Sequence, residues 1–422
     1  KRQACIRQDL PKTIALSRRA LALIPATAHD ARSALALNLG MAHLQVGQII
    51  EAEEAFSEAH AMAQEVQNHH VKLLAIGFLS MVQAARGQLH KAADLLYEAV
   101  ARGGDSPANA LPHLVQGALH YEWNQLEEAG THLQKAITLA QRSGNSELEC
   151  GAYRRLALLK QAMGDHAAAS AALALAEKIA GDNAPPLTRA RNSDTAVYLA
   201  VAQNDLETAR RRLELMQTKA SASLFYAPLF LAPAHLYLAQ GEKSAASEHL
   251  AAEYDKANQS GLRYGQIEIR LLQALAAIDA NDALDFLSEA LKEAHQQGFI
   301  RTFVDKGVNL IPLLQMAASS RLFPDYVRSL LAEFKGVVPL PSSPSSPNLA
   351  TGSPAETISD REIEVLQLLA DGLTYQEIAQ TMFVSVNTVK SHLKSIYGKL
   401  SVHNRRDAVA RARVLHLIVP NQ

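Results

Sequence analysis

The sequence predicts an all-α protein in which a long superhelix of helical repeats precedes a small four-helix domain. Alanine is abundant among the 422 residues and aromatic residues make up only 5% of them, a composition that favours close-packed helices over β-sandwiches. A column of small residues recurs at a nearly constant spacing through most of the chain. A stretch rich in proline and serine then separates this repeat body from a C-terminal tail that has its own helical pattern.

The repeat is visible as three aligned columns. The small-residue column, spaced by 37 or 40 residues, is Ala52, Ala92, Ala129, Ala169, Ala209, Ala246 and Ala283. A larger apolar residue follows each of them by four positions: Phe56, Leu96, Leu133, Leu173, Leu213, Leu250 and Leu287. A turn residue precedes the first six by five positions: Gly47, Gly87, Asn124, Gly164, Asn204 and Gly241. Each unit is therefore predicted as helix, tight turn and helix, and stacking of the units generates a superhelix.

Two features bound this array. The seventh copy has Ile278 at the turn position, so an altered turn is expected there. Residues 10–23 read as the second helix of an earlier pair, and the first residue is lysine. From these two observations we expect an N-terminally truncated repeat domain over residues 1–336.

The pattern of Gly47, Ala52, Phe56 and Ala59 resembles the tetratricopeptide repeat family, although units of 37–40 residues exceed its usual length of about 34. This resemblance covers about 300 residues and implies a concave surface that takes part in sensing or oligomerisation. Aromatic residues suggest where a ligand groove would lie: Tyr121, Trp123, Tyr226 and Phe230, with Phe225 beside them. The alternative, that these side chains form core between repeats, stays open at the level of sequence.

Several functional classes find no support in the sequence. The string Gly241-Glu242-Lys243-Ser244 lacks the upstream glycine of a phosphate-binding loop, and no catalytic motif occurs, so we expect neither enzymatic activity nor a cofactor in this chain. Cys5 and Cys150 cannot form a disulfide framework, and the scattered histidines predict no metal site. The chain has no run of eighteen apolar residues and no signal peptide, from which we expect a cytoplasmic protein without a membrane partner.

Residues 337–357 are predicted to be a linker. Five prolines stand among serines between positions 339 and 354, and the stretch carries no charge before Glu356. Proline lacks a backbone donor and serine buries little surface, so an extended tether is expected. An ordered surface loop within one domain is the alternative, although loops of this length are uncommon in compact domains.

The tail, residues 358–422, is predicted to contain four helices. Two capping boxes, at 359–362 and 374–377, begin the first two, and Gly372 ends the first. The third helix carries one apolar stripe: Val386, Val389, Leu393, Ile396 and Leu400. A fourth helix follows a cap at Asn404. The formal charge is −5 over residues 355–384 and +6 over residues 385–415.

Two short helices joined by a tight turn, the second with a basic outer face, describe a helix-turn-helix that reads the DNA major groove. From charge alone, a bundle with a solvated basic face is an equal alternative. Residues 359–400 resemble the LuxR-type helix-turn-helix, including the run from Val384-Ser385 to His392-Leu393. The resemblance implies base contacts from Lys390, Ser391 and Lys394, phosphate contacts from Asn387, Thr388 and Lys399, and a dimer surface around Val409 and Arg413. Gly398 departs from the family pattern.

A repeat body joined to such a domain resembles the C-terminal part of the large MalT-like regulators of the LuxR family. The resemblance implies a bacterial transcriptional regulator, an activator, that binds double-stranded promoter DNA. It also implies RNA polymerase as a partner, a small-molecule inducer or protein effector at the repeats, and a homo-oligomer on DNA. A nucleotide-binding module precedes the repeats in that family. A repeat-based scaffold with secondary DNA binding is the alternative function. The formal net charge of −1 excludes only a uniformly basic coat.

Overall fold

The computed structural model describes residues 10–181, 184–219, 230–334, 360–382 and 405–414, and single residues between 389 and 418. The chain divides into two units, residues 1–339 and 340–422. Each unit is described by itself. Within the described part of the chain all regular structure is helical, which confirms the predicted all-α class.

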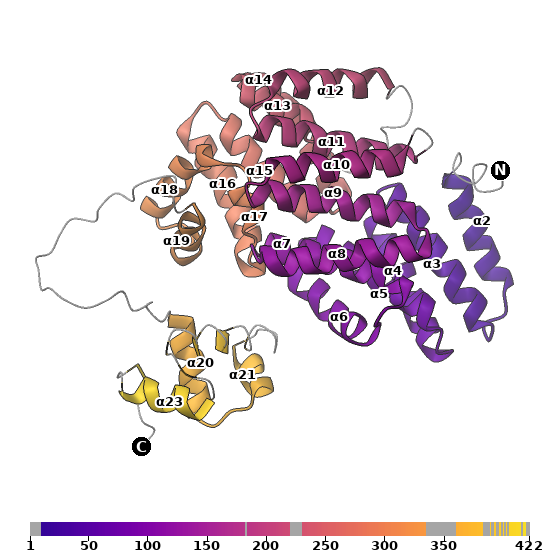
Figure 1. The fold of residues 1–422 in the computed structure, drawn as a ribbon, viewed down its shortest axis with the longest axis horizontal. Coiled ribbons are helices and arrows are strands. Elements are labelled where there is room, and N and C mark those ends of the chain that lie inside the picture. The colour runs from indigo at the N-terminus through magenta and orange to yellow at the C-terminus, as the bar shows by residue number, and fades with distance from the viewer. Residues whose placement is uncertain are drawn as a thin grey trace, which may run out of the picture. The chain divides into compact units, whose positions relative to one another are not determined.

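The first unit stacks antiparallel helix pairs one upon the next (Figure 1). The helices up to the third repeat are α2 (Leu10–Leu23), α3 (His29–Gln45), α4 (Ile49–Glu65), α5 (His69–Ala85), α6 (Leu89–Arg102), α7 (Ala110–Glu122) and α8 (Leu126–Ser143). The later pairs consist of α9 (Ser146–Ala162), α10 (His166–Ala180), α11 (Pro186–Ala202), α12 (Leu206–Lys219), α13 (Ala232–Gln240), α14 (Lys243–Gln259), α15 (Arg263–Ala276) and α16 (Ala280–Ala294).

The three sequence columns have the expected structural roles. All six predicted turn residues have positive φ, and the two asparagines, Asn124 at 57° and Asn204 at 60°, adopt the left-handed conformation that this residue type tolerates. Every member of the small-residue column is buried, as is the larger residue four positions later. The seventh turn differs as expected: Ile278 is exposed and the Asp279 side chain caps α16 by accepting from the amides of Asn281 and Asp282.

Close packing within a pair depends on small residues. Gly40 on α3 faces Phe56 on α4, and a Cβ at Gly40 would lie 2.6 Å from Cδ1 of that ring. The Phe56 ring in turn stacks on Phe78 of α5 with centroids 5.0 Å apart. A phenylalanine can therefore occupy the larger apolar position of this repeat because the facing residue, Gly40, has no side chain.

Beyond the seventh pair the body continues in short elements that the repeat pattern does not predict. They are η3 (His295–Gln297), α17 (Arg301–Val304), η4 (Val308–Leu310), α18 (Ile311–Ser319) and α19 (Pro324–Glu333). Phe299 and Phe303 are fully buried here and share one core with Leu119 of α7 and Ile267 of α15. Residues from the third repeat and from the end of the body thus belong to a single hydrophobic core.

The second unit contains α20 (Asp360–Ala370), α21 (Tyr375–Thr381) and α23 (Arg405–Val414). The predicted capping box at the start of α21 is present: the Thr374 amide donates to Glu377 Oε2 at 2.7 Å, and the Glu377 amide donates to Thr374 Oγ1 at 3.3 Å. Four members of the predicted third-helix stripe are buried in the core of this unit: Val389, Leu393, Ile396 and Leu400. Val386 and the cap residues Ser359 and Asn404 lie outside the described residues.

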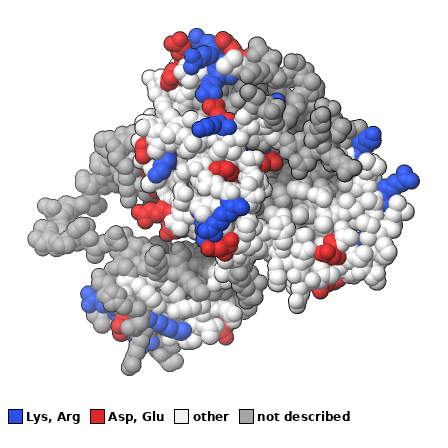
Figure 2. Space-filling view, turned by 45° about the vertical axis from the view of Figure 1, so that its right-hand side comes forward, with Lys and Arg blue, Asp and Glu red and all other residues white. Residues whose placement is uncertain are grey.

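On the face that Figure 2 draws, acidic and basic side chains are interspersed among a predominantly uncharged surface. This distribution agrees with the near-zero formal charge of the chain. Among the described residues, no helix is long and apolar enough to cross a membrane.

Candidate functional sites

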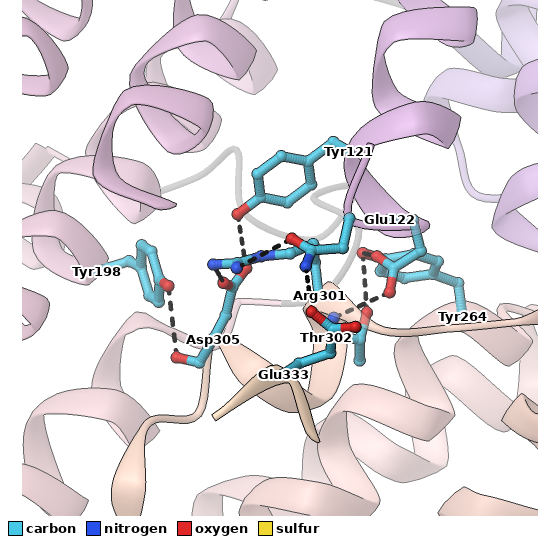
Figure 3. Close-up of polar contacts among 9 residues, drawn as sticks. Tyr121, Glu122, Tyr198, Tyr264, Arg301, Thr302, Asp305 and Glu333 are labelled. Atoms are coloured by element: carbon cyan, nitrogen blue, oxygen red, sulfur yellow. Dashed lines mark hydrogen bonds and ion pairs between the residues drawn. The ribbon is translucent and has the colours of Figure 1, made fainter. Parts of the chain in front are cut away.

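The repeat body contains a buried polar junction between the α7–α8 turn and the segment from Gln297 to Asp305. Glu122, at the end of α7, accepts from the Thr302 amide through Oε1 at 2.9 Å and from the Tyr264 hydroxyl through Oε2 at 3.0 Å. Its backbone carbonyl accepts from the Ile300 amide at 3.0 Å. Figure 3 shows the Glu122 carboxylate directed between Thr302 and Tyr264. Three elements that lie far apart in the sequence therefore meet at one carboxylate.

An ion pair forms the other half of the junction. The Arg301 guanidinium donates to Asp305, and the Tyr121 hydroxyl donates to the same carboxylate at 2.6 Å (Figure 3). The side chains of Arg301 and Asp305 are 10% and 15% exposed, so the pair is largely removed from solvent. Asn124 accepts from Arg301 at 3.3 Å and donates to Glu333 of α19 at 2.7 Å. The turn residue Asn124 thus links the repeat to two later segments.

Burial changes the protonation behaviour of this junction. Burial raises the pKa of Glu122 to about 7, against the opposing hydrogen bonds from Thr302 and Tyr264. Burial also raises the pKa of Asp305, although the adjacent Arg301 charge works in the opposite direction. The carboxyl of Glu122 therefore titrates near neutral pH at a site where it joins distant parts of the fold.

The segment around α17 makes further contacts with the repeat helices. Lys306 donates to Glu268 of α15 at 2.6 Å, and its side chain is only 3% exposed. The Tyr198 hydroxyl of α11 donates to the Asp305 carbonyl at 3.5 Å. Residues 297–306 consequently contact α7, α11 and α15, and they connect repeats that are not neighbours in the array.

Two residues of the predicted groove have partners within the chain. Tyr121 is 7% exposed and bonds to Asp305, and the Trp123 indole donates to the Gln297 carbonyl at 3.0 Å. Both side chains are therefore partnered by the chain itself and belong to the core at the junction. Phe230 packs partly buried against the core formed by α11, α12 and α13, at a separate place. Tyr226 and Phe225 lie outside the described residues.

The junction has no signature in the sequence. Glu122, Arg301, Thr302 and Asp305 stand outside every repeat column, and no motif marks them. Their separation of about 180 residues along the chain leaves no local pattern from which their contact could be inferred.

The predicted DNA-contacting residues lie outside the described residues. This applies to the base-contacting set Lys390, Ser391 and Lys394, to the phosphate-contacting set Asn387, Thr388 and Lys399, and to Gly398. Their roles stay predictions. Of the predicted dimer surface, Arg413 is exposed, whereas Val409 packs partly buried against the core of its own unit. Arg405 donates to the Leu369 carbonyl at the end of α20 at 2.9 Å, so it holds α23 against α20.

The chain matches two family models. Residues 2–320 match the MalT-like TPR region. Residues 356–412 match the luxR family of bacterial regulatory proteins. The two matches cover the repeat body and the C-terminal unit respectively.

Curated relatives span both parts. The HTH-type transcriptional regulator MalT of Vibrio cholerae is 23% identical over 98% of this chain and 48% of the relative. The protein of the same name from Serratia proteamaculans is 24% identical over 95% of this chain and 47% of the relative. The chain therefore spans about half the length of these relatives. A solved Rap protein, complexed with competence and sporulation factor, is 15% identical over 72% of this chain and 75% of its own, with a TM-score of 0.35.

Proposed function

We propose that this chain, which belongs to the MalT-like TPR family, is the effector-sensing and DNA-reading part of a bacterial transcriptional regulator. The observation that carries the DNA-reading role is the luxR-family match over residues 356–412, together with a C-terminal unit in which the predicted third-helix stripe is buried. In a helix-turn-helix an inward apolar stripe on the reading helix leaves the opposite face for DNA. That face carries the lysines Lys390 and Lys394 in the sequence.

The proposal assigns direct readout to three residues. Lys390, Ser391 and Lys394 contact base edges in the major groove, while Asn387, Thr388 and Lys399 contact phosphates. The net +6 charge of residues 385–415 supports it, since phosphate neutralisation supplies much of the affinity for DNA and makes it dependent on salt. Arg413 is exposed on α23, in keeping with a role in pairing two copies on DNA.

The repeat body is proposed to receive the regulatory signal. The junction supports this role. There, buried polar contacts of Glu122, Arg301 and Asp305 join segments that lie about 180 residues from each other along the chain. A ligand or protein effector that binds the superhelix would change the free energy of such contacts and so bias its conformation. Within the proposal the regulator is cytoplasmic, activates transcription through RNA polymerase as an oligomer on promoter DNA, and uses no cofactor in this chain. A nucleotide-binding module would belong to the part of the relatives that this chain does not span.

Fluorescence anisotropy tests the DNA-reading role. Duplexes from candidate promoter regions and their scrambled versions are titrated with the wild-type chain, the Lys390→Ala/Lys394→Ala variant and a control, Lys178→Ala/Lys292→Ala. The control removes two exposed lysines from the repeat body. We expect the first variant to lose about 1–3 kcal/mol of discrimination per good base contact and the control to lose none.

The salt dependence separates the two kinds of contact. Loss of a phosphate contact, as in Lys399→Ala, should weaken binding to all sequences and reduce the slope of log K against log salt by about one. Full sequence discrimination by Lys390→Ala/Lys394→Ala would show that the reading face is wrong. Binding that never discriminates between sequences would favour a protein-interaction scaffold with secondary DNA binding.

A further inference from the structure

Three arginines on two adjacent repeat helices have no anionic partner in the part of the chain that the structure describes. Arg154 and Arg155 lie on α9, and Arg191 lies on α11. None of their guanidinium groups forms a hydrogen bond or ion pair with a described residue. Other arginines of the body do form ion pairs, for example Arg212 with Glu177 at 2.6 Å and Arg270 with Glu289 at 2.7 Å.

A contact between α9 and α11 brings these arginines together. Asn192 donates to Cys150 Sγ at 3.3 Å, so the two helices meet at these positions. Arg154 follows Cys150 by one helical turn and therefore lies on the same side of α9. Arg191 is the immediate neighbour of Asn192. Burial, followed by the charges of Arg191 and Arg155, lowers the pKa of Arg154 to about 9.

The charge of Arg155 also acts on a third repeat helix, α15. Burial raises the pKa of Tyr264, and the charge of Arg155 opposes this shift. Burial alone would raise the pKa of Glu268. The charges of Lys306, His235 and Arg155 outweigh this effect, and the pKa is lowered. The arginine cluster, defined as Arg154, Arg155 and Arg191, therefore lies on α9 and α11, and its charge acts on residues of α15.

The acids near the cluster do not neutralise it. Asp194 accepts from the Ala232 amide at 2.9 Å, and burial raises its pKa to about 7, so it carries only part of a negative charge at neutral pH. Glu268 is paired with Lys306 at 2.6 Å. Glu147, which faces Arg191, is exposed and forms no ion pair with a described residue. Three full positive charges thus face acids that are partly protonated, paired elsewhere or solvated.

The cluster is partly accessible to solvent. Arg191 is exposed, and Arg154 and Arg155 are partly exposed. A solute can therefore reach these side chains without unfolding the body. Because like charges held close together repel, an anion that binds between them relieves an unfavourable interaction and forms charge-assisted hydrogen bonds.

We propose that Arg154, Arg155 and Arg191 form a binding site for a compact multivalent oxyanion, a phosphate ester or a small polycarboxylate. The planar guanidinium presents paired donors that match phosphate and carboxylate oxygens alike. The inference rests on the sensing role proposed for the repeat body, and it names the chemical class of the effector. The site uses no residue of the helix-turn-helix.

Calorimetric titration and thermal shift of the whole chain test the site. The probes are glucose 6-phosphate, citrate and inorganic phosphate at constant ionic strength, with glucose as the neutral control. The variants are Arg154→Gln/Arg191→Gln and a control of equal charge change, Arg142→Gln/Arg328→Gln, whose arginines are 54% and 77% exposed. We expect saturable binding of a phosphate ester or of citrate by wild type and the control, accompanied by a rise in melting temperature.

The first variant is expected to bind at least about tenfold more weakly, because two of the three guanidinium groups are gone. Without anion it should melt at the same temperature as wild type or higher, since it lacks the repelling charges, and this separates lost binding from misfolding. Preference for citrate or for the phosphate ester identifies the oxyanion. Failure of all three anions to bind wild type, or equal binding by Arg154→Gln/Arg191→Gln, would overturn the proposal.

DNA binding by the same proteins separates this inference from the proposed function. Arg154→Gln/Arg191→Gln should bind DNA as wild type does in the absence of anion. If wild type binds the anion but no DNA, the DNA-reading proposal fails while the anion site stands. If wild type binds DNA but no anion, the anion-site proposal fails while the DNA-reading proposal stands.

Discussion

Replacing Glu122 by glutamine should remove a pH dependence from the stability of the repeat body. Glu122 is 2% exposed, and burial raises its pKa to about 7 from an ordinary 4.5. The folded protein therefore holds this proton more tightly than the unfolded chain does. Stability from the neutral carboxyl is fully present below about pH 4.5 and is lost as the pH rises through 7.

The size of the effect follows from the two pKa values. The difference between 4.5 and about 7 corresponds to about 3 kcal/mol in the free energy of unfolding. Glutamine resembles the protonated carboxyl: it can accept from the Thr302 amide and donate to the Tyr264 hydroxyl. At about pH 5 the variant and wild type should therefore have similar stability. At about pH 8 Glu122→Gln should be the more stable protein by up to about 3 kcal/mol.

Denaturant unfolding, followed by circular dichroism at several pH values, measures this difference. Asp194 titrates in the same range but is present in both proteins, so its contribution cancels. The control is Glu127→Gln, which removes an exposed carboxylate at the start of α8 and should shift the curve by a small constant amount. Parallel stability curves for wild type and Glu122→Gln between about pH 5 and 8 would refute the reasoning. So would a variant that is the less stable protein at the higher pH.

Four further substitutions test other parts of the fold. Asp305→Ala leaves the buried Tyr121 hydroxyl without its acceptor and the Arg301 guanidinium without its charged partner, so thermal unfolding should show a loss of about 3–5 kcal/mol; a loss below about 1 kcal/mol would contradict the buried pair. Gly40→Ala should cost about 1–3 kcal/mol because its Cβ would meet the Phe56 ring at 2.6 Å. Gly130→Ala, whose Cβ would lie 3.4 Å from Leu159, should instead gain up to about 1 kcal/mol, and equal effects of the two changes would be inconsistent with the packing described. Leu393→Ala, at a buried position of the C-terminal unit, should cost about 2–5 kcal/mol and reduce binding to all DNA sequences, while retention of wild-type stability would place Leu393 outside the core.

Limited proteolysis addresses the predicted linker at 337–357, which lies outside the described residues. Its proline and serine content predicts first cleavage within this stretch, with release of two folded fragments. Mass spectrometry of the early products identifies the cleavage sites. A single resistant core of 422 residues would instead support the alternative of an ordered loop.

The repeat architecture could be predicted from the sequence because its determinants are local. The residues that shape each turn lie within five positions of the small-residue column, and a buried alanine such as Ala129 needs only its own helix pair to explain it. The same holds for the capping box of Thr374 and Glu377, which acts within one helical turn. Local signals of this kind recur with the repeat and therefore reinforce one another.

The junction and the arginine cluster could not be predicted in this way. Glu122 contacts Thr302, which lies 180 residues later in the chain. This contact depends on the accumulated rotation between the repeats that separate α7 from α17. Likewise, Arg154 and Arg191 are ordinary surface residues by sequence, and only the packing of α9 against α11 places their charges together. The sequence by itself determined the helical repeats, their turns and the family of the C-terminal domain. The tertiary structure alone decided which polar groups are buried together, because small rotations between successive repeats accumulate and bring distant side chains into contact.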